Sequence, residues 1–203
     1  TNVPATNSDA VADFTFGLML DIARKISENV LEVKAGKWNK SIGVDVCKKT
    51  LGIIGYGAIG KRVAKRAQGF DMRVLVYDPY VAKKPKGTDV NFVDFMTFIE
   101  ESDFISVHVP LTSDTRNLIG EEQMRHMKKG TFIINAARGG IVDENALYHY
   151  LTKGHLGGAA LDVIEKEPAN DSPLLKLSNV IITSHIASYS KEAINAVSMA
   201  CAK

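Results

Sequence analysis

Apolar residues recur along this chain in two alternating patterns, short continuous runs and longer stretches with helical spacing. The continuous runs predict strands at 51–54, 73–77, 104–107, 131–135, 158–161 and 180–183. The helical spacing predicts helices at 8–33, 59–68, 92–100, 122–127, 144–152 and 191–200. Strands that are apolar on both faces are covered by helices on both sides, as in a parallel sheet. We therefore predict a single α/β domain over residues 1–203, built on a doubly wound parallel sheet.

A glycine pattern directly follows the first predicted strand. Gly55, Gly57 and Gly60 form G-x-G-x-x-G between this strand and the next predicted helix. The first glycine permits a tight turn, the second lets the backbone approach a pyrophosphate, and the third lets the helix pack closely on the strand. The pyrophosphate would then lie at the helix N-terminus, where free N–H groups favour negative charge. This context predicts a dinucleotide site of the Rossmann kind rather than a purely structural glycine turn.

An acidic residue follows the second predicted strand. Asp78 comes directly after the apolar run 72–77, where a carboxylate can accept hydrogen bonds from the adenosine ribose hydroxyls. A carboxylate at this position repels a 2′-phosphate, so the sequence favours NAD over NADP. The alternative interpretation of Asp78 is a turn-forming Asp-Pro pair with Pro79.

Composition and charge exclude some partners. With a net charge of +2 over 203 residues, nothing indicates nucleic acid or a membrane surface as a partner. Apolar runs stay far shorter than a transmembrane helix. Cys47 and Cys201 lie far apart without metal-ligand spacing, so we expect two free thiols in a reducing cytoplasm and no metal. Because the chain starts without Met, we expect it to be an excised piece of a longer protein.

Polar residues follow the ends of several predicted strands. They are Asp78, His108, Asn135, Arg138, Asp162, Glu165, Glu167 and His185. Ligands of a doubly wound sheet lie beyond the carboxyl ends of its strands. We therefore expect these side chains to converge on one crevice that could hold a cofactor and carry out catalysis.

Arg138 is the candidate for holding a substrate. It follows Ala136 and Ala137, whose small side chains let a flat ring such as nicotinamide approach the backbone. Its guanidinium forms a planar fork that matches a carboxylate, which a 2-keto or 2-hydroxy acid carries. The alternative is a solvated arginine in a glycine turn.

His185 is the candidate for proton transfer. A histidine can donate or accept a proton during hydride transfer, and a nearby carboxylate such as Glu167 would stabilise the imidazolium and fix the ring. Asp162, at the end of a predicted strand, could accept a hydrogen bond from the nicotinamide carboxamide. We expect Glu165 and Lys166 to face solvent.

The other histidines have simpler interpretations. His108 precedes Val109, Pro110 and Leu111, which together look like a lip that packs against the cofactor. The remaining three, at positions 126, 149 and 155, lie in or beside predicted helices, and we expect them to be surface or core residues.

In this order and spacing, the motifs resemble the nucleotide-binding domain of the D-isomer-specific 2-hydroxyacid dehydrogenases. The resemblance covers 7–12, 51–60, 108–112, 135–143, 158–168 and 184–187. Within the family the chain is most similar to the D-3-phosphoglycerate dehydrogenases, with glyoxylate/hydroxypyruvate reductases close behind. The related formate dehydrogenases would carry glutamine where this chain has Glu167, which argues against that reaction.

The resemblance implies hydride transfer between nicotinamide and a D-2-hydroxy acid, here 3-phosphoglycerate and 3-phosphohydroxypyruvate in serine biosynthesis. It assigns the catalytic arginine, glutamate and histidine to Arg138, Glu167 and His185. It assigns cofactor contacts to Gly55, Gly57, Ile59, Gly60, Asp78, Val109, Pro110, Thr115, Ala136 and Asp162. It also implies a homodimer formed through the first helix.

The chain departs from the family pattern in two ways. Family members usually have proline before the catalytic histidine, whereas this chain has Ser184, which affects the expected geometry of the loop. Family members also carry a substrate domain that this chain lacks. We therefore expect the isolated chain to bind NAD(H) and to turn over 2-keto acids negligibly.

Three alternatives stay open. The first is a glyoxylate/hydroxypyruvate reductase. The second is a non-catalytic NAD(H)-sensing protein, similar to the transcriptional corepressors that share this fold. The third is an NADPH-preferring reductase, although such an enzyme would be expected to replace Asp78 with a neutral or basic residue.

Overall fold

The computed structural model of the chain describes residues 6–81, 87 and 89–201. Within these residues, seven strands form one parallel sheet in the order β3-β2-β1-β4-β5-β6-β7. The strands are β1 Thr50–Ile54, β2 Arg73–Tyr77, β3 Asn91–Phe92, β4 Phe104–Val107, β5 Phe132–Asn135, β6 Gly158–Leu161 and β7 Val180–Ile182. The order reverses at β1, so the predicted doubly wound parallel sheet is confirmed.

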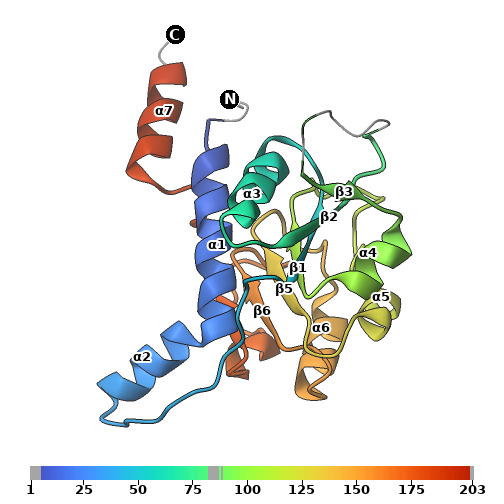
Figure 1. The fold of residues 1–203 in the computed structure, drawn as a ribbon. Coiled ribbons are helices and arrows are strands. Elements are labelled where there is room, and N and C mark those ends of the chain that lie inside the picture. Colours follow the sequence, from blue (N-terminus) through green and yellow to red (C-terminus); the bar gives the residue numbers. More distant parts are fainter. Residues whose placement is uncertain (1–5, 82–86, 88, 202–203) are drawn as a thin grey trace.

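Helices cover both faces of this sheet (Figure 1). One face carries α1 Ser8–Arg24 and α3 Ala58–Gln68, and the other carries α4 Phe95–Glu101, α5 Glu121–His126 and α6 Glu144–Thr152. Two further helices, α2 Ile26–Lys34 and α7 Lys191–Cys201, extend away from the body, and a short 3₁₀ helix spans Pro173–Lys176. None of the helices in this described part is long and apolar enough to cross a membrane.

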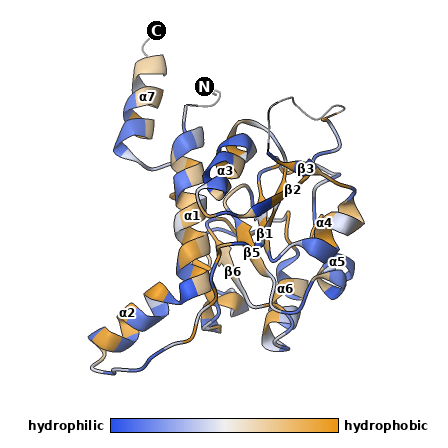
Figure 2. Cartoon of the chain, viewed as in Figure 1, coloured by the Kyte–Doolittle hydropathy of each residue, from blue (hydrophilic) through white to orange (hydrophobic). Residues whose placement is uncertain are grey.

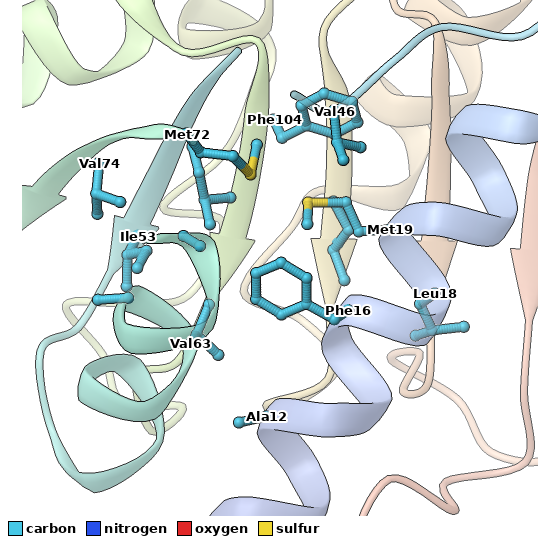
Figure 3. Close-up of a cluster of buried hydrophobic side chains, with 14 of the residues drawn as sticks. Ala12, Phe16, Leu18, Met19, Val46, Ile53, Val63, Met72, Val74 and Phe104 are labelled. Atoms are coloured by element: carbon cyan, nitrogen blue, oxygen red, sulfur yellow. The ribbon is translucent and has the colours of Figure 1, made fainter. Parts of the chain in front are cut away.

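Two hydrophobic clusters hold the layers together, one on each face of the sheet. In the first, Phe16 of α1 and Val63 of α3 pack with strand residues such as Ile53 (Figure 3). In the second, helix residues such as Phe98 pack with Ile54. Successive strand residues point to opposite faces, which is why Ile53 and Ile54 belong to different clusters. Fully burying each large apolar side chain stabilises the fold by about 1.5–3 kcal/mol.

The single helix predicted over 8–33 is wrong, because the chain turns at Lys25. This residue adopts a left-handed conformation with φ +54°, which ends α1 and starts α2 in a new direction (Figure 1). The carboxylate of Asp21 accepts hydrogen bonds from the backbone N–H of Ser27, at 2.7 Å, and from its hydroxyl. It thereby caps the first turn of α2. The apolar spacing continues through the turn, which is why the sequence pattern did not reveal it.

The helix predicted over 92–100 begins later than expected. Residues 91–92 form the short strand β3, which pairs with Leu75 and Val76 of β2. Asp94 then caps α4, since its Oδ1 accepts a hydrogen bond from the backbone N–H of Thr97 at 3.0 Å. A strand of two residues is too short to produce an alternating pattern.

Candidate functional site

The carboxyl ends of the parallel strands face a cleft of about 660 Å³. Predicted site residues that line it are Ile59, His108, Val109, Pro110, Ala136, Arg138, Asp162 and His185. These residues come from the start of α3 and from the loops after β4, β5, β6 and β7. A neighbouring cavity of about 460 Å³ shares Asp162 and His185 with the cleft and adds Glu167. Of the eight polar residues predicted to converge on one crevice, five line these two cavities: His108, Arg138, Asp162, Glu167 and His185. Asp78, Asn135 and Glu165 line neither of them.

The glycine turn between β1 and α3 has the shape that a pyrophosphate requires. Gly55 has φ +91°, and a Cβ there would lie 2.6 Å from the carbonyl oxygen of His108. A Cβ on Gly60 would lie 2.0 Å from the carbonyl oxygen of Gly55, so only glycine fits at both positions. A Cβ on Gly57 would meet nothing within 4 Å. The space beside Gly57, at the N-terminus of α3, can hold a pyrophosphate.

Asp78 is held close to this glycine turn. Its Oδ2 accepts a hydrogen bond from the backbone N–H of Tyr56 at 2.7 Å, which fixes it against the residue between Gly55 and Gly57. Its Oδ1 accepts the backbone N–H of Tyr80 at 3.0 Å, as in the Asp-Pro turn that was the alternative interpretation of Asp78. Each carboxylate oxygen can accept a further hydrogen bond, so the turn does not prevent the carboxylate from binding ribose hydroxyls.

His185 and Glu167 form a direct pair. His185 Nδ1 lies 3.0 Å from Glu167 Oε2, and both side chains are about half exposed, at 46% and 43%. When Nδ1 carries a proton it donates to the carboxylate, which leaves Nε2 to exchange a proton with a bound molecule. The pair can therefore hold a proton at the edge of the cleft and release it.

Asp162 organises the loop that carries His185. Its buried carboxylate accepts hydrogen bonds from Thr183 Oγ1 at 2.6 Å and from the backbone N–H groups of Ile186 at 2.9 Å and Ala187 at 2.8 Å. Its carbonyl accepts the N–H of His185 at 3.0 Å. These bonds compensate a buried carboxylate and fix His185 in a left-handed conformation, φ +58°. Asp162 therefore builds the histidine loop, a role that the sequence did not predict, and its predicted contact with the cofactor stays a prediction.

Arg138 is exposed and lies in the cleft wall after β5. The side chain of Asn135 folds this loop, because its Nδ2 donates to the carbonyl of Arg138 at 2.9 Å and its Oδ1 accepts the N–H of Ala137 at 3.0 Å. The Arg138 guanidinium donates to the carbonyl of Ala137 at 2.7 Å, and its remaining N–H groups can bind an anion.

Thr115 is not among the residues that line the cleft. Its hydroxyl donates to the carbonyl of Pro110 at 2.6 Å and accepts the N–H of Thr112 at 2.8 Å. Thr115 therefore shapes the loop after β4, and its predicted contact with the cofactor stays a prediction.

His108 forms part of the cleft wall as a neutral imidazole. Its Nε2 lies 2.7 Å from Ser106 Oγ, and its Nδ1 is buried without a hydrogen-bond partner among the described residues. Although part of the residue reaches the cleft surface, burial lowers the pKa of His108 to about 3. A neutral side chain agrees with the predicted packing role and excludes His108 as a proton donor at pH 7.

The buried His108 is expected to make the fold less stable in mild acid. The unfolded chain takes up a proton near the ordinary value of 6.5, whereas the folded chain resists protonation until about pH 3. Lowering the pH from 7 to 5 should therefore reduce the free energy of unfolding by ~2 kcal/mol through this group. Urea unfolding of His108→Gln should lack this component, and an identical pH dependence in both proteins would contradict the assignment.

The remaining histidines and Cys47 are not among the residues that line the cleft or its neighbouring cavity. His126 and His149 are exposed, and His155 Nε2 lies 3.1 Å from the carbonyl oxygen of Met127. Cys47 is an exposed free thiol, and the side chain of Cys201 lies outside the described part of the chain. Across the residues described, no group of three or more His, Cys, Asp or Glu could hold a metal ion.

The sequence patterns missed two charged partners of Glu165, Arg116 and Glu144, which lie beside the site. Glu165 is exposed as expected, but its Oε1 accepts a hydrogen bond from Arg116 Nη1 at 2.8 Å. The backbone N–H of Glu165 donates to Glu144 Oε1 at 2.5 Å. The partners lie 49 and 21 residues from Glu165, so no local pattern could have revealed them.

Proteins of named function align with 95% of this chain. A D-3-phosphoglycerate dehydrogenase from Archaeoglobus fulgidus is 48% identical over 196 residues, covering 95% of this chain and 37% of that protein. A glyoxylate reductase from Korarchaeum cryptofilum is 46% identical over 200 residues, covering 95% of this chain and 60% of that protein. The chain therefore spans less than two thirds of the length of these relatives.

A solved structure matches the fold over nearly the whole chain. D-lactate dehydrogenase from Aquifex aeolicus, complexed with NAD and lactic acid, superposes with a TM-score of 0.90 at 33% identity. The match covers 99% of this chain and 66% of that one. The family model described as "D-isomer specific 2-hydroxyacid dehydrogenase, NAD binding domain" matches residues 16–187. With its glycine turn, Asp78 and parallel sheet, this chain belongs to the D-isomer specific 2-hydroxyacid dehydrogenase family, as an NAD-binding domain.

Proposed function

We propose that this chain, over residues 1–203, is the NAD-binding and catalytic domain of a longer dehydrogenase that acts on a D-2-hydroxy acid. The observation that carries the proposal is the His185–Glu167 pair at 3.0 Å, beside a cleft that also contains Arg138. A proton-exchanging pair and an anion-binding group next to a nicotinamide site are what reversible reduction of a 2-keto acid needs.

Arg138, His185 and Glu167 have separate roles in the proposed reaction. Arg138 binds the substrate carboxylate and polarises the C2 oxygen. His185 donates its proton to that oxygen as the keto acid is reduced, and Glu167 stabilises the imidazolium before the transfer. Bound NADH supplies the hydride that C2 receives. In the oxidative direction, His185 takes the proton back from the C2 hydroxyl.

For the substrate, we propose 3-phosphoglycerate and 3-phosphohydroxypyruvate, which would place the enzyme in serine biosynthesis. Glyoxylate or hydroxypyruvate is the second candidate, because the named relatives include both kinds of enzyme at 48% and 46% identity. We further propose a cytoplasmic location, which would keep the exposed thiol of Cys47 reduced.

The substrate proposal is tested by steady-state kinetics of the full-length protein with phosphohydroxypyruvate, hydroxypyruvate, glyoxylate and pyruvate. The highest kcat/KM is expected with phosphohydroxypyruvate, whereas a maximum with glyoxylate or hydroxypyruvate would favour the second candidate. Turnover of none of them, with NADH binding retained, would favour an NAD(H)-sensing protein. The chain alone is expected to bind NADH and to react negligibly, because closure over the substrate supplies much of the rate.

Asp78 is expected to set the preference for NAD(H) over NADP(H). A 2′-phosphate beside this carboxylate would bring like charges together, so we expect NADPH to bind about a hundredfold more weakly than NADH. In Asp78→Ser the two affinities should approach each other. Calorimetric titration of both proteins with both cofactors measures this, and NADPH binding as tightly as NADH to the unmodified protein would contradict the role.

We also propose a homodimer formed through α1 and α2. No residue of α2 is buried, although several of its residues are hydrophobic, as the orange segments of α2 in Figure 2 show. Leu31 is 68% exposed, and Trp38 and Ile42, which follow α2, are 84% and 90% exposed. An apolar surface of this kind marks an association site, and two-fold dimers are the commonest oligomers.

The dimer is tested by light scattering of the full-length protein. We expect the mass of two chains in the micromolar range, and a shift towards one chain in Leu31→Glu, because a charge would be buried in the interface. A monomer throughout that range would count against the proposal.

A further inference from the structure

Arg116 connects two loops that do not follow one another in the chain. It lies in the loop after β4, and Glu165 lies in the loop after β6, two residues before Glu167. Arg116 Nη1 donates to Glu165 Oε1 at 2.8 Å. Because β5 lies between β4 and β6 in the sheet, this ion pair spans the loop that carries Arg138.

The loop after β5 is enclosed between the other two. A Cβ on Gly139 would lie 2.0 Å from the carbonyl oxygen of Ile164, so this loop touches the backbone just before Glu165. On the other side, the N–H of Asn117 donates to the carbonyl of Gly140 at 2.8 Å. A Cβ on Gly140 would lie 3.3 Å from Arg116 Nη1. The guanidinium therefore lies over the loop that carries Arg138 while it holds Glu165.

A second contact to Glu165 comes from Glu144, the first residue of α6. The backbone N–H of Glu165 donates to Glu144 Oε1 at 2.5 Å, which brings two carboxylate side chains into the same region. Burial raises the pKa of Glu144, and the neighbouring charges of Glu165 and Asp143 also raise it, while the hydrogen bond from the Glu165 N–H partly opposes them. Arg116 is the cation bonded to Glu165, and it compensates the repulsion between these carboxylates.

We propose that Arg116 is a positioning residue, which through Glu165 holds the turn 165–167 so that Glu167 meets His185. The proposal rests on the proposed function, because it concerns the geometry of the proton-exchanging pair. The Arg116 and Glu165 side chains are 52% and 59% exposed, so their ion pair adds little to the stability of the fold. Its effect is therefore expected in the reaction rate rather than in unfolding.

The test compares Arg116→Gln with the unmodified full-length protein. We expect kcat for the 2-keto acid to fall about tenfold, since small displacements of reacting groups are costly, while the KM for NADH stays the same. With Glu167 displaced, the imidazolium is less stabilised, so the pH profile of kcat should move to lower pH. Arg116→Lys should retain most of the rate. Arg116→Gln combined with Glu165→Gln should recover part of it, because the repulsion is removed.

Arg73→Gln is the matched control. Arg73 pairs with Glu101 at the same 2.8 Å, and these side chains are 53% and 43% exposed. This pair lies where β2 begins and α4 ends, at the amino ends of the strands, whereas the cleft lies at their carboxyl ends. Breaking it removes an equivalent ion pair and is expected to leave kcat and its pH profile unchanged.

The proposal is wrong if Arg116→Gln keeps the unmodified kcat and pH profile, or if Arg73→Gln changes both equally. A histidine NMR titration gives a readout that needs no turnover, with the His185 signal assigned from a His185→Gln spectrum. Arg116→Gln alone should move its midpoint to lower pH. The other charged groups that line the cavities of His185 are Asp162 and Arg138, and neither bonds to Arg116 within the described residues. If the unmodified protein reduces no 2-keto acid, the proposed function fails, whereas the titration still decides the role of Arg116.

Discussion

Replacing His185 with alanine in the full-length protein is expected to reduce turnover of its 2-keto acid by about a hundred- to ten-thousand-fold. The reason is that His185 lies at the cleft with Glu167 3.0 Å from its Nδ1, and no other group lining the cleft in the described part can donate a proton equally well. Burial holds the pKa of His108 at about 3, so His108 cannot substitute for it near neutral pH. NADH affinity should stay nearly unchanged.

Steady-state kinetics and NADH fluorescence titration measure the two effects separately. His126→Ala, at the exposed end of α5, is the control and should behave like the unmodified protein. Unmodified turnover of His185→Ala with every 2-keto acid tried would show that the proton-transfer role is wrong. A loss of NADH affinity equal to the loss of rate would show that His185 binds cofactor instead.

The second large effect is expected at the glycine turn. In Gly57→Val, the side chain would fill the open space where a pyrophosphate fits. We expect the loss of about two hydrogen bonds from backbone N–H groups of the turn to this charged group. At ~1.5–3 kcal/mol each, their loss corresponds to NADH binding at least about a hundredfold more weakly. The fold should lose only about 1 kcal/mol, because Gly57 has φ −76° and opens α3.

Gly60→Ala provides the contrast. Its Cβ would lie 2.0 Å from the Gly55 carbonyl oxygen, so the turn must move, and both stability and cofactor affinity should fall. Thermal unfolding and fluorescence titration of both variants distinguish the two cases. If Gly57→Val binds NADH as tightly as the unmodified protein, the cofactor does not pass beside Gly57.

Much of the fold follows from patterns that lie within a few residues of one another. The predicted helix 144–152 agrees with α6 at both ends, and at its start Asp143 Oδ1 accepts hydrogen bonds from the N–H groups of Asn145 and Ala146. The turn at Lys25 was not predictable in the same way. A left-handed lysine costs free energy locally, so only its surroundings, including the Asp21–Ser27 contact, make it favourable.

The candidate site likewise contains some residues whose geometry a local pattern predicts and others whose contacts it does not. The glycine motif and Asp78 stand in a local context that predicts their geometry, and the structure places them together. The hydrogen bonds that Asp162 accepts come from residues 21 to 25 positions away, and these partners had no recognisable spacing. The same bonds show how the loop is held although Ser184 replaces the proline that is usual in the family. The residues on either side of Ser184 bind Asp162, and His185 still meets Glu167.

The two outer strands of the sheet have a consequence for how this domain can associate. An exposed outer strand offers unpaired N–H and C=O groups that can capture a strand from another molecule and start aggregation. Here β3 has two residues and β7 has three, so each offers a very short template. Contacts between copies are therefore expected through the side chains of α2 and the segment after it, which favours a defined assembly over open-ended stacking of sheets.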